Sequence, residues 1–383
     1  MVKRIPLDTV CAPKIPTVSP QYDGIIDYVD ISAVDNTEKC IVNMQCISAK
    51  EAPSRAKQLL EVGDILVSTV RPNLNAVAMV EQQTDNLLVG STDYYVLRCS
   101  DIVDKRYVFY FCQSPYFVDD MTSQATGASY PAVSSGIVKS STIPHHPIEM
   151  QKQIADRLDK VSELITLRKE QIAKLDQLVK SRFIELFGGI SDSKRYPYKA
   201  VKELTDVISG GTPSREVNEY WECGTIPWVK TTELQNNIIT EIDEHITEAG
   251  LDNSSAKLVP AGTVLIAMYG QGKTRGMTGY LGVEACTNQA CACILPSDSI
   301  NQKFLWQFFV LSYDNLRDMA KGGNQPNLNG NIIKNYPVLY PPMELQGQFA
   351  TFVEQTDKSK LAIQQSLDKL ELLKKSLMQE YFG

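Results

Sequence analysis

Two stretches of the chain share one helical pattern of apolar and polar positions. In the first, from about 149 to 187, apolar residues recur every three or four positions, at Ile154, Leu158, Val161, Ile165, Ile172, Leu175, Val179 and Leu186. The second repeats this spacing, at Phe349, Val353, Ile363, Leu367, Leu370, Leu377 and Tyr381. The spacing is close to a heptad seam, although Arg168, Arg182, Lys360 and Lys374 interrupt it. The pattern predicts two long helices that bury a common seam.

The two helical stretches belong to an internal repeat. A shift of 195 positions places Pro147 on Pro342 and Gln151 on Gln346, and the register holds without gaps to the Phe-Gly pairs at 187–188 and 382–383. Upstream the match is looser: "IDYVDIS" (26–32) resembles "IPWVKTT" (226–232), and "GDILVS" (63–68) resembles "GTVLIA" (262–267). The sequence therefore predicts a first globular unit (1–148), a central helix (149–188), a second globular unit (189–343) and a C-terminal helix (344–383).

Connectivity predicts how the two helices run. The first leads from one globular unit into the other, and the second starts where that other unit ends. Two such helices can bury a seam against each other only if they are antiparallel. At about 1.5 Å per residue, each is about 55 Å long. A hairpin that merely completes a core is the alternative, but it does not explain why the helices are the better-matched part of the repeat.

Both globular units mix short β-rich runs with turns. The runs that predict strands are "DILVSTV" (64–70), "AVAMV" (76–80), "YYVLRC" (94–99), "TVLIAMY" (263–269) and "CACIL" (291–295). Helical patterns cover 104–121 and 300–319, and both end in Asp-Met before a glycine-containing loop. We therefore expect an α+β fold in each unit.

Composition narrows the class of protein. The chain of 383 residues is 43% hydrophobic and 22% charged, without an apolar run long enough to span a bilayer and without a signal-peptide pattern. Its nine cysteines are scattered, which favours reduced thiols in the cytoplasm. The net charge of −7 argues against a self-sufficient nucleic-acid binder, unless a partner supplies most phosphate contacts.

Motifs for catalysis are missing from the sequence. "GQGKT" (270–274) resembles part of a phosphate-binding loop, but Ala267 stands where the first glycine of that loop is needed. The spacing of histidine, cysteine and acidic residues fits no zinc site, and Cys291 and Cys293 favour a structural role on one strand face. No S-adenosylmethionine loop or amino-methyltransferase motif occurs. We expect no catalytic residue, metal or cofactor on this chain.

Glycine-rich polar loops remain, and they recur in both units. Their side chains supply hydrogen bonds to phosphates and base edges, although any single one also suits an ordinary turn. The candidate DNA-binding residues in the first unit are Ser68, Arg71, Asn73, Asn75, Thr92, Tyr94, Ser129 and Tyr130. Those in the second unit are Thr212, Ser214, Arg215, Lys230, Thr231, Tyr269, Gln271, Lys273, Thr274, Arg275, Asn288, Gln289, Asn324 and Gln325.

Four motifs carry a resemblance to a known family. They are "VGDILVSTVRPNLN" (62–75), "GGTPS" (210–214), "GGNQPNLNGNIIKNYPVLYPP" (322–342) and the twice-used helix start P-[IM]-E-[ML]-Q-x-Q at 147 and 342. In this paired arrangement the chain resembles, over nearly its whole length, the specificity subunit of a type I restriction-modification system.

The resemblance implies two target-recognition domains, joined by antiparallel helices that form a coiled-coil spacer. Each domain would read one half of a gapped double-stranded DNA sequence. Two modification (methyltransferase) subunits, which bind S-adenosylmethionine, would dock on the helices, and two ATP-dependent restriction subunits would complete the complex. Half-sites of about 3 to 5 base pairs and a gap of about 5 to 8 follow from B-DNA geometry. A stand-alone modification enzyme and a coiled-coil adaptor that does not read DNA are the rival interpretations.

Overall fold

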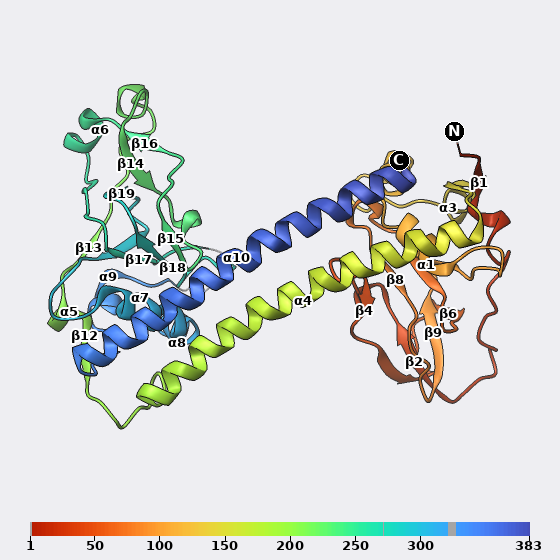
Figure 1. Cartoon of the computed structure of the whole chain (residues 1–383), viewed down its shortest axis with the longest axis horizontal. Coiled ribbons are helices and arrows are strands. Elements are labelled where there is room, and N and C mark those ends of the chain that lie inside the picture. Colours follow the sequence, from red (N-terminus) through yellow and green to blue (C-terminus); the bar gives the residue numbers. More distant parts are fainter. Residues whose placement is uncertain (1, 271, 321–326) are drawn as a thin grey trace. The chain divides into compact units, whose positions relative to one another are not determined.

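The computed structural model describes residues 2–270, 272–320 and 327–383. Two compact units make up the chain. Unit 1 combines Met1–Glu170 with Gln364–Gly383, and unit 2 is Gln171–Ile363. Each unit therefore contains one globular part and a piece of each long helix (Figure 1).

Unit 1 contains two main sheets and three short helices. The larger sheet has the order β5 (Gln45–Ser48), β2 (Ile25–Val29), β9 (Leu87–Ser91), β6 (Ala56–Leu59), and β2 runs parallel to β9. The second sheet is antiparallel, with the order β10 (Tyr94–Leu97), β7 (Ile65–Ser68), β8 (Val77–Met79). Two further pairs join β1 (Arg4–Pro6) to β11 (Thr142–Pro144) and β3 (Val34–Asp35) to β4 (Cys40–Ile41). The helices are α1 (Lys105–Phe111), α2 (Pro115–Ser123) and α3 (Ser135–Ser140).

Unit 2 repeats this plan with a larger central sheet. Its order is β13 (Val207–Ser209), β20 (Cys291–Ile294), β17 (Val264–Ala267), β18 (Thr278–Leu281), β15 (Asn237–Ile239). A smaller sheet has the order β16 (His245–Ile246), β14 (Ile226–Val229), β19 (Cys286–Thr287), with β14 parallel to β19. One strand pair joins β12 (Tyr198–Ala200) to β21 (Pro337–Leu339). The helices are α5 (Val201–Leu204), α6 (Glu248–Asp252), α7 (Gln302–Leu311), α8 (Tyr313–Asp318) and α9 (Gly330–Lys334).

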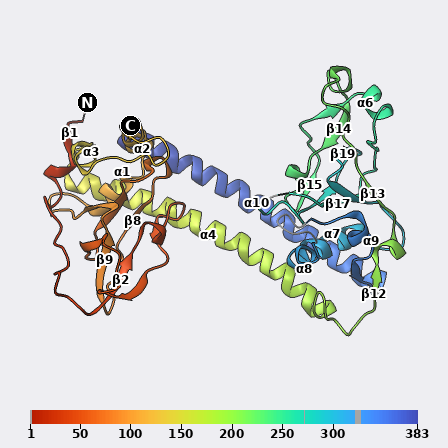
Figure 2. The same cartoon turned by 180° about the vertical axis from the view of Figure 1, so that it is seen from behind.

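The two long helices, α4 (Ile148–Phe187) and α10 (Met343–Phe382), differ by the same shift of 195 at both ends. Within unit 1 the start of α4 meets the end of α10, where Arg157 donates to the Tyr381 hydroxyl at 3.1 Å. Within unit 2 the end of α4 meets the start of α10 (Figure 2). There Phe187 packs edge-on against Phe349. Both units therefore hold the helices antiparallel, and the expected α+β fold with long helices is confirmed.

The seam deviates from the predicted heptad near the helix ends. Phe183 and Phe187 are fully buried, whereas the predicted Leu186 is half-buried. At the end of α10 the buried residues are Met378 and Phe382 rather than Leu377 and Tyr381. The reason is that these helix ends pack into a globular core and not only against the other helix: the Phe382 ring lies 5.1 Å from Tyr107 and 5.8 Å from Phe111.

The helical patterns at 104–121 and 300–319 each form two helices instead of one. In unit 1 the break falls at Ser114, which caps α2 and precedes a proline in its first turn. In unit 2 the break falls at Ser312, between α7 and α8. The five predicted strands are all present with shorter bounds, as β7, β8, β10, β17 and β20.

One glutamine explains why the same phrase starts both long helices. Gln151 is 1% exposed; its amide oxygen accepts from the backbone N–H of Asp104 at 3.0 Å, and its amide nitrogen donates to the His146 carbonyl at 2.8 Å. Gln346 makes the same pair of bonds, to Asn301 at 2.9 Å and Pro341 at 2.8 Å. Asp104 and Asn301 are the N-caps of α1 and α7. The glutamine therefore fixes each long helix to the first helix of its globular part.

The cysteines, the potential metal ligands and the long helices of the described residues can each be examined for further chemistry. All nine cysteines are free, and burial raises the pKa of the Cys293 thiol to about 11, which keeps it protonated and unreactive. The described part of the chain contains no cluster of three potential metal ligands. Nor does any helix in it combine the length and apolarity needed to cross a membrane.

Candidate nucleic-acid interface

The topology of unit 2 brings most of its candidate loops to one sheet edge. Strands β13 and β17 end at Ser209 and Ala267, and both positions pair with the start of β20, at Ala292 and Cys291. The loops after β13, after β17 and before β20 therefore leave the same edge. The neighbouring parallel strands β14 and β19 also end there, because the N–H of Asn288 donates to the Val229 carbonyl at 3.1 Å.

Glycine permits the close approach of the first loop to this edge. A Cβ on Gly210 would lie 2.1 Å from the Thr287 hydroxyl, and one on Gly211 would lie 2.2 Å from the Ser255 carbonyl carbon. A side chain at either position would force the loop away from the sheet. The pair of glycines thus places Thr212 against Gln289, with a hydrogen bond between their side chains.

A cation supported by aromatic rings extends from the same loop. The Arg215 guanidinium lies 3.6 Å from the centre of the Trp221 ring and pairs with Glu244 at 2.6 Å. Lys230 also pairs with Glu244, at 2.9 Å. The hydrogen bond from Lys230, outweighing partial burial, and the bond from Arg215 hold the pKa of the Glu244 carboxyl below its usual range. This ion triad orients both cations while the Arg215 side chain stays 52% exposed.

Asn288, in the loop before β20, has unused bonding capacity. Its side-chain oxygen is buried, and the residues that the structure describes offer it no hydrogen-bond donor. An unpaired buried amide oxygen is costly, so a donor from a bound molecule would stabilise it. Thr231 and the exposed Ser214 and Gln289 complete this part of the edge.

The loop after β17 is tied to α8. The Tyr313 hydroxyl donates to the Lys273 carbonyl at 2.7 Å, and Arg317 donates to the Arg275 carbonyl at 2.8 Å. These bonds are accepted by backbone atoms of the loop. They hold the main chain in place without using the exposed Lys273 side chain. Tyr269 is 41% exposed, and Thr274 is half-buried. Gln271, Asn324 and Gln325 lie outside the described residues.

Unit 1 presents a corresponding edge after β7. Thr69 donates to the Asp93 carbonyl, and the N–H of Arg71 donates to the Pro131 carbonyl at 2.7 Å. The Arg71 guanidinium lies 4.6 Å from the centre of the Tyr130 ring, and that tyrosine is 59% exposed. Asn73, Thr92 and Ser129 are also exposed, in the loops around this edge. Both units thus present an arginine resting on an aromatic ring among polar loops.

Three candidates in unit 1 have structural roles instead, and we remove them from the candidate contacts. Tyr94 is 2% exposed and its hydroxyl donates to the Asp30 carbonyl; burial is the main cause that raises its pKa. Ser68 is 5% exposed and donates to the Val70 carbonyl. Asn75 donates to the Cys112 carbonyl and accepts from Lys39, so its amide is already used. The sequence pattern of a strand next to a turn did not reveal that these three side chains point inward.

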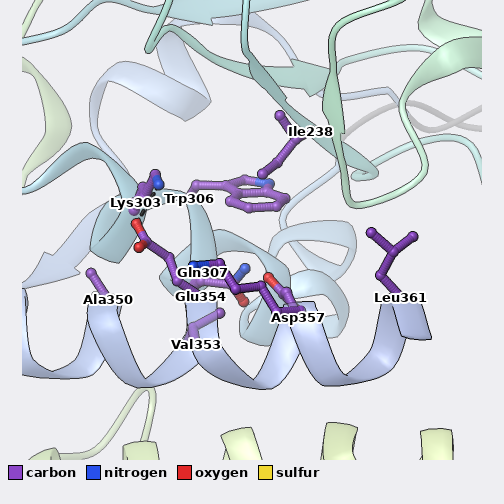
Figure 3. A pocket seen from close by; sticks show the side chains of 10 residues that line it. Ile238, Lys303, Trp306, Gln307, Ala350, Val353, Glu354, Asp357 and Leu361 are labelled. Atoms are coloured by element: carbon purple, nitrogen blue, oxygen red, sulfur yellow. Dashed lines mark hydrogen bonds and ion pairs between the residues drawn. The ribbon is translucent and has the colours of Figure 1, made fainter. Parts of the chain in front are cut away.

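Unit 2 also contains an apolar hollow of about 270 Å³ beside α10, apart from the loop edge (Figure 3). It is lined by Ile238, Lys303, Trp306, Gln307, Ala350, Val353, Glu354, Asp357, Lys358 and Leu361. Gln307 stands six residues after the N-cap Asn301, as Tyr110 stands six after Asp104. In unit 1 the buried Tyr110 donates to Asp159, which the shift of 195 matches to Glu354. Gln307 thus lines the hollow at the position where unit 1 has the buried Tyr110.

The comparison with known proteins identifies the repeated unit. Residues 13–177 and 194–373 each match the family model described as "Type I restriction modification DNA specificity domain". The chain belongs to this family. It is a DNA specificity subunit of a type I restriction-modification system.

Curated relatives of this specificity subunit include three whose names state the same role. The HindI specificity subunit of Haemophilus influenzae is 21% identical over 85% of this chain and 86% of its own length. The EcoR124I/EcoR124II specificity subunit of Escherichia coli is 24% identical over 62% of this chain and 59% of its own length. The MjaIX specificity subunit of Methanocaldococcus jannaschii is 30% identical over 43% of this chain, a match that spans 38% of the relative.

Solved structures support the fold of the specificity subunit. The S subunit from M. genitalium is similar with a TM-score of 0.60, at 14% identity, over 100% of this chain and 96% of that chain. A chain from a study of type I R-M assembly and conformational transition is similar with a TM-score of 0.63, at 23% identity, over 99% and 97%.

Proposed function

We propose that this chain is the non-catalytic subunit that reads a two-part double-stranded DNA sequence, one part per unit. The observation that carries the proposal is the polar loop edge that occurs in both units at matching strand ends. Base edges are read by arginine, asparagine, glutamine and hydroxyl side chains of this kind. Because the loops differ between the units, the two half-sites differ as well.

The helices set the gap between the half-sites in this proposal. A helix of 40 residues is about 60 Å long. Together with B-DNA geometry, this length fits half-sites of about 3 to 5 base pairs separated by about 5 to 8. A change of helix length by one repeat of the apolar helical pattern changes the gap and leaves both half-sites intact.

Two modification subunits docked on the helices supply the chemistry, with S-adenosylmethionine bound to them, and two restriction subunits use ATP. Partner cations also clamp the DNA, which reconciles DNA binding with the net charge of −7 on this chain. We place the assembled complex in the cytoplasm, where its DNA substrate lies.

The test is methylation mapping. The chain is co-expressed with its modification subunit in a methylation-free host, and adenine methylation is mapped across the genome by long-read sequencing. We expect a gapped, asymmetric motif that disappears without this chain. If a complex that assembles and binds S-adenosylmethionine gives no motif, the chain is a coiled-coil adaptor instead.

A further inference from the structure

A second hollow, in unit 1, is lined by four lysines together with polar, acidic and apolar side chains. Its volume is about 590 Å³. We call it the lysine pocket and define it by Lys39, Lys169, Lys374, Lys375, Asn75 and Gln113. Lys39 comes from the turn before β4, Asn75 from the turn before β8, and the other three lysines from α4 and α10. Four cationic side chains from three parts of the unit therefore face one space.

The fold holds Lys39 in a costly backbone conformation. Its φ is 58° and that of Asn75 is 48°, both in the left-handed region that residues other than glycine seldom occupy. The Lys39 amine donates to both the carbonyl oxygen and the side-chain oxygen of Asn75, at 2.5 Å and 2.8 Å. Backbone strain of this kind persists where the surrounding structure fixes it, and it gathers at ligand sites. Here it fixes one amine at the wall of the pocket.

Two of the amines make no direct ion pair, although Asp35 attracts Lys39, and Glu38, Asp159 and Glu371 attract Lys374 from further away. Within the described residues, Lys39 and Lys374 have no carboxylate at ion-pair distance. Burial, followed by the charge of Lys374, lowers the pKa of Lys39 to about 8; burial and the charge of Lys169 lower that of Lys374. Half-buried cations that repel each other are stabilised by an anion placed between them.

The nearby carboxylates are engaged or at the rim. Glu38 pairs with Lys169 at 2.8 Å. Asp35 accepts from the backbone N–H groups of Thr37 and Glu38. Glu371 and Asp119 also line the hollow, but both are exposed. The carboxylates therefore offset only part of the burial and mutual repulsion of the inner amines, and the pKa of both stays lowered.

Unit 2 lacks the inner amines Lys39 and Lys374 at the matching positions, although the shift of 195 places Lys180 at the position of Lys375. The left-handed residue directly before β15 is Asn236, as Lys39 directly precedes β4. Gly276 stands two residues before β18, as Asn75 stands two before β8. The shift of 195 places Val179 at the position of Lys374. The left-handed backbone is thus common to both units, whereas the positions that match Lys39 and Lys374 carry no amine in unit 2.

We propose that the lysine pocket binds a phosphate group. Ammonium groups bind phosphate through charge-assisted hydrogen bonds, and the neutral Gln113 amide supplies a further donor. The phosphate comes either from the DNA backbone or from a free phosphate-bearing molecule. The inference does not rest on the proposed function, because inorganic phosphate serves as the probe.

The experiment uses the full chain labelled with ¹⁵N-lysine and titrated with inorganic phosphate, against chloride at equal ionic strength, at pH 7. We expect the amide signals of Lys39 and Lys374 to move with phosphate and not with chloride. Lys39→Asn introduces the residue that unit 2 carries at Asn236, and asparagine tolerates the left-handed backbone at this position. We expect Lys39→Asn and Lys374→Met each to weaken phosphate binding about tenfold.

The matched control is Lys160→Met, at an exposed lysine on α4 of the same unit, which should leave binding unchanged. Absence of a phosphate-specific shift, or pocket variants that bind phosphate as tightly as the natural chain, overturns the proposal. A DNA arm separates the two sources. If Lys39→Asn also weakens binding of the assembled complex to a non-cognate duplex, and phosphate competes with that duplex, the DNA backbone is the source. If duplex binding is unchanged while phosphate binding falls, the ligand is a free phosphate-bearing molecule.

Discussion

Units 1 and 2 are alike at the buried glutamines that join each long helix to its globular part, and unlike at other matched positions, both buried and exposed. Gln151 and Gln346 make the same two buried bonds, and Arg106 and Lys303 reach the matched carboxylates Asp159 and Glu354. At other matched positions the side chains differ. Gln307 of unit 2 corresponds to Tyr110 of unit 1, and Asn236 corresponds to Lys39. The difference teaches that the junction glutamines are matched because their loss would leave buried backbone groups without partners, whereas a buried contact such as that of Tyr110 with Asp159 differs between the units.

The largest effect should come from the junction glutamines. Gln346→Ala leaves the Asn301 N–H and the Pro341 carbonyl buried without partners, which should cost about 2 to 4 kcal/mol. All three tryptophans lie in unit 2, so urea unfolding followed by tryptophan fluorescence reports this loss. Gln151→Ala should destabilise unit 1 in the same way, which faster hydrogen exchange at the start of α1 would report.

Gln153→Ala and Gln348→Ala are the matched controls, since both residues belong to the same repeated phrase but are exposed. They should change stability by less than about 0.5 kcal/mol. A junction variant no less stable than its control would break the comparison at its strongest point.

The next effect distinguishes Tyr110 from Gln307. Tyr110→Gln removes a buried ring and its bond to Asp159, and should destabilise unit 1 by about 2 to 3 kcal/mol. Gln307→Tyr adds a ring where unit 2 already has a hollow, so the free energy of unfolding should change by less than about 1 kcal/mol. Urea unfolding with hydrogen exchange in each unit measures both. Equal losses would mean that the hollow does not correspond to the Tyr110 site.

The loop edges should separate the two half-sites. Arg71→Asn, which suits the left-handed backbone at that position, should weaken or relax one half of the methylated motif only. Arg215→Gln should affect the other half only. Each is expected to cost about 1 to 3 kcal/mol of discrimination at one base position. Methylation mapping with both variants checks this, and a variant that alters both halves would contradict one reading edge per unit.

The smallest effect concerns pH. Burial and Lys374 lower the pKa of Lys39 to about 8, whereas the unfolded chain binds that proton up to its ordinary value. Between these two pH values the unfolded chain holds more protons, so the Lys39 contribution to stability rises with pH there. Asp35, Glu38, Asp119, Lys169, Glu371, Lys374 and Lys375 also face the pocket and remain in the variant.

Any stability gain of Lys39→Asn over the natural chain should therefore be largest at pH 7 and shrink toward pH 10. Hydrogen exchange in unit 1, corrected for its intrinsic pH dependence, gives this difference. A difference independent of pH would show that Lys39 is not titrating in the folded unit within this range.

Sequence reasoning predicted the helices well because their signal is local and repeated. The 3-4 spacing and the shift of 195 are read directly from the chain, and α4 and α10 reproduce that shift. The five strands were found for the same reason, since short apolar runs between turns are local patterns. Single positions were less predictable: Tyr94 and Arg71 both lie in polar-looking stretches, yet one is buried and the other exposed.

The sequence by itself determined the repeat, the α+β class, the two long helices and the family. Only the tertiary structure decided which ends of the helices enter which core, as with Phe187 and Phe382, and which loops share a sheet edge. It also decided that Lys39 and Lys374, far apart in sequence, face one pocket. The physical reason is that periodicity specifies which face of an element is buried, whereas the neighbours of that face depend on contacts between distant segments.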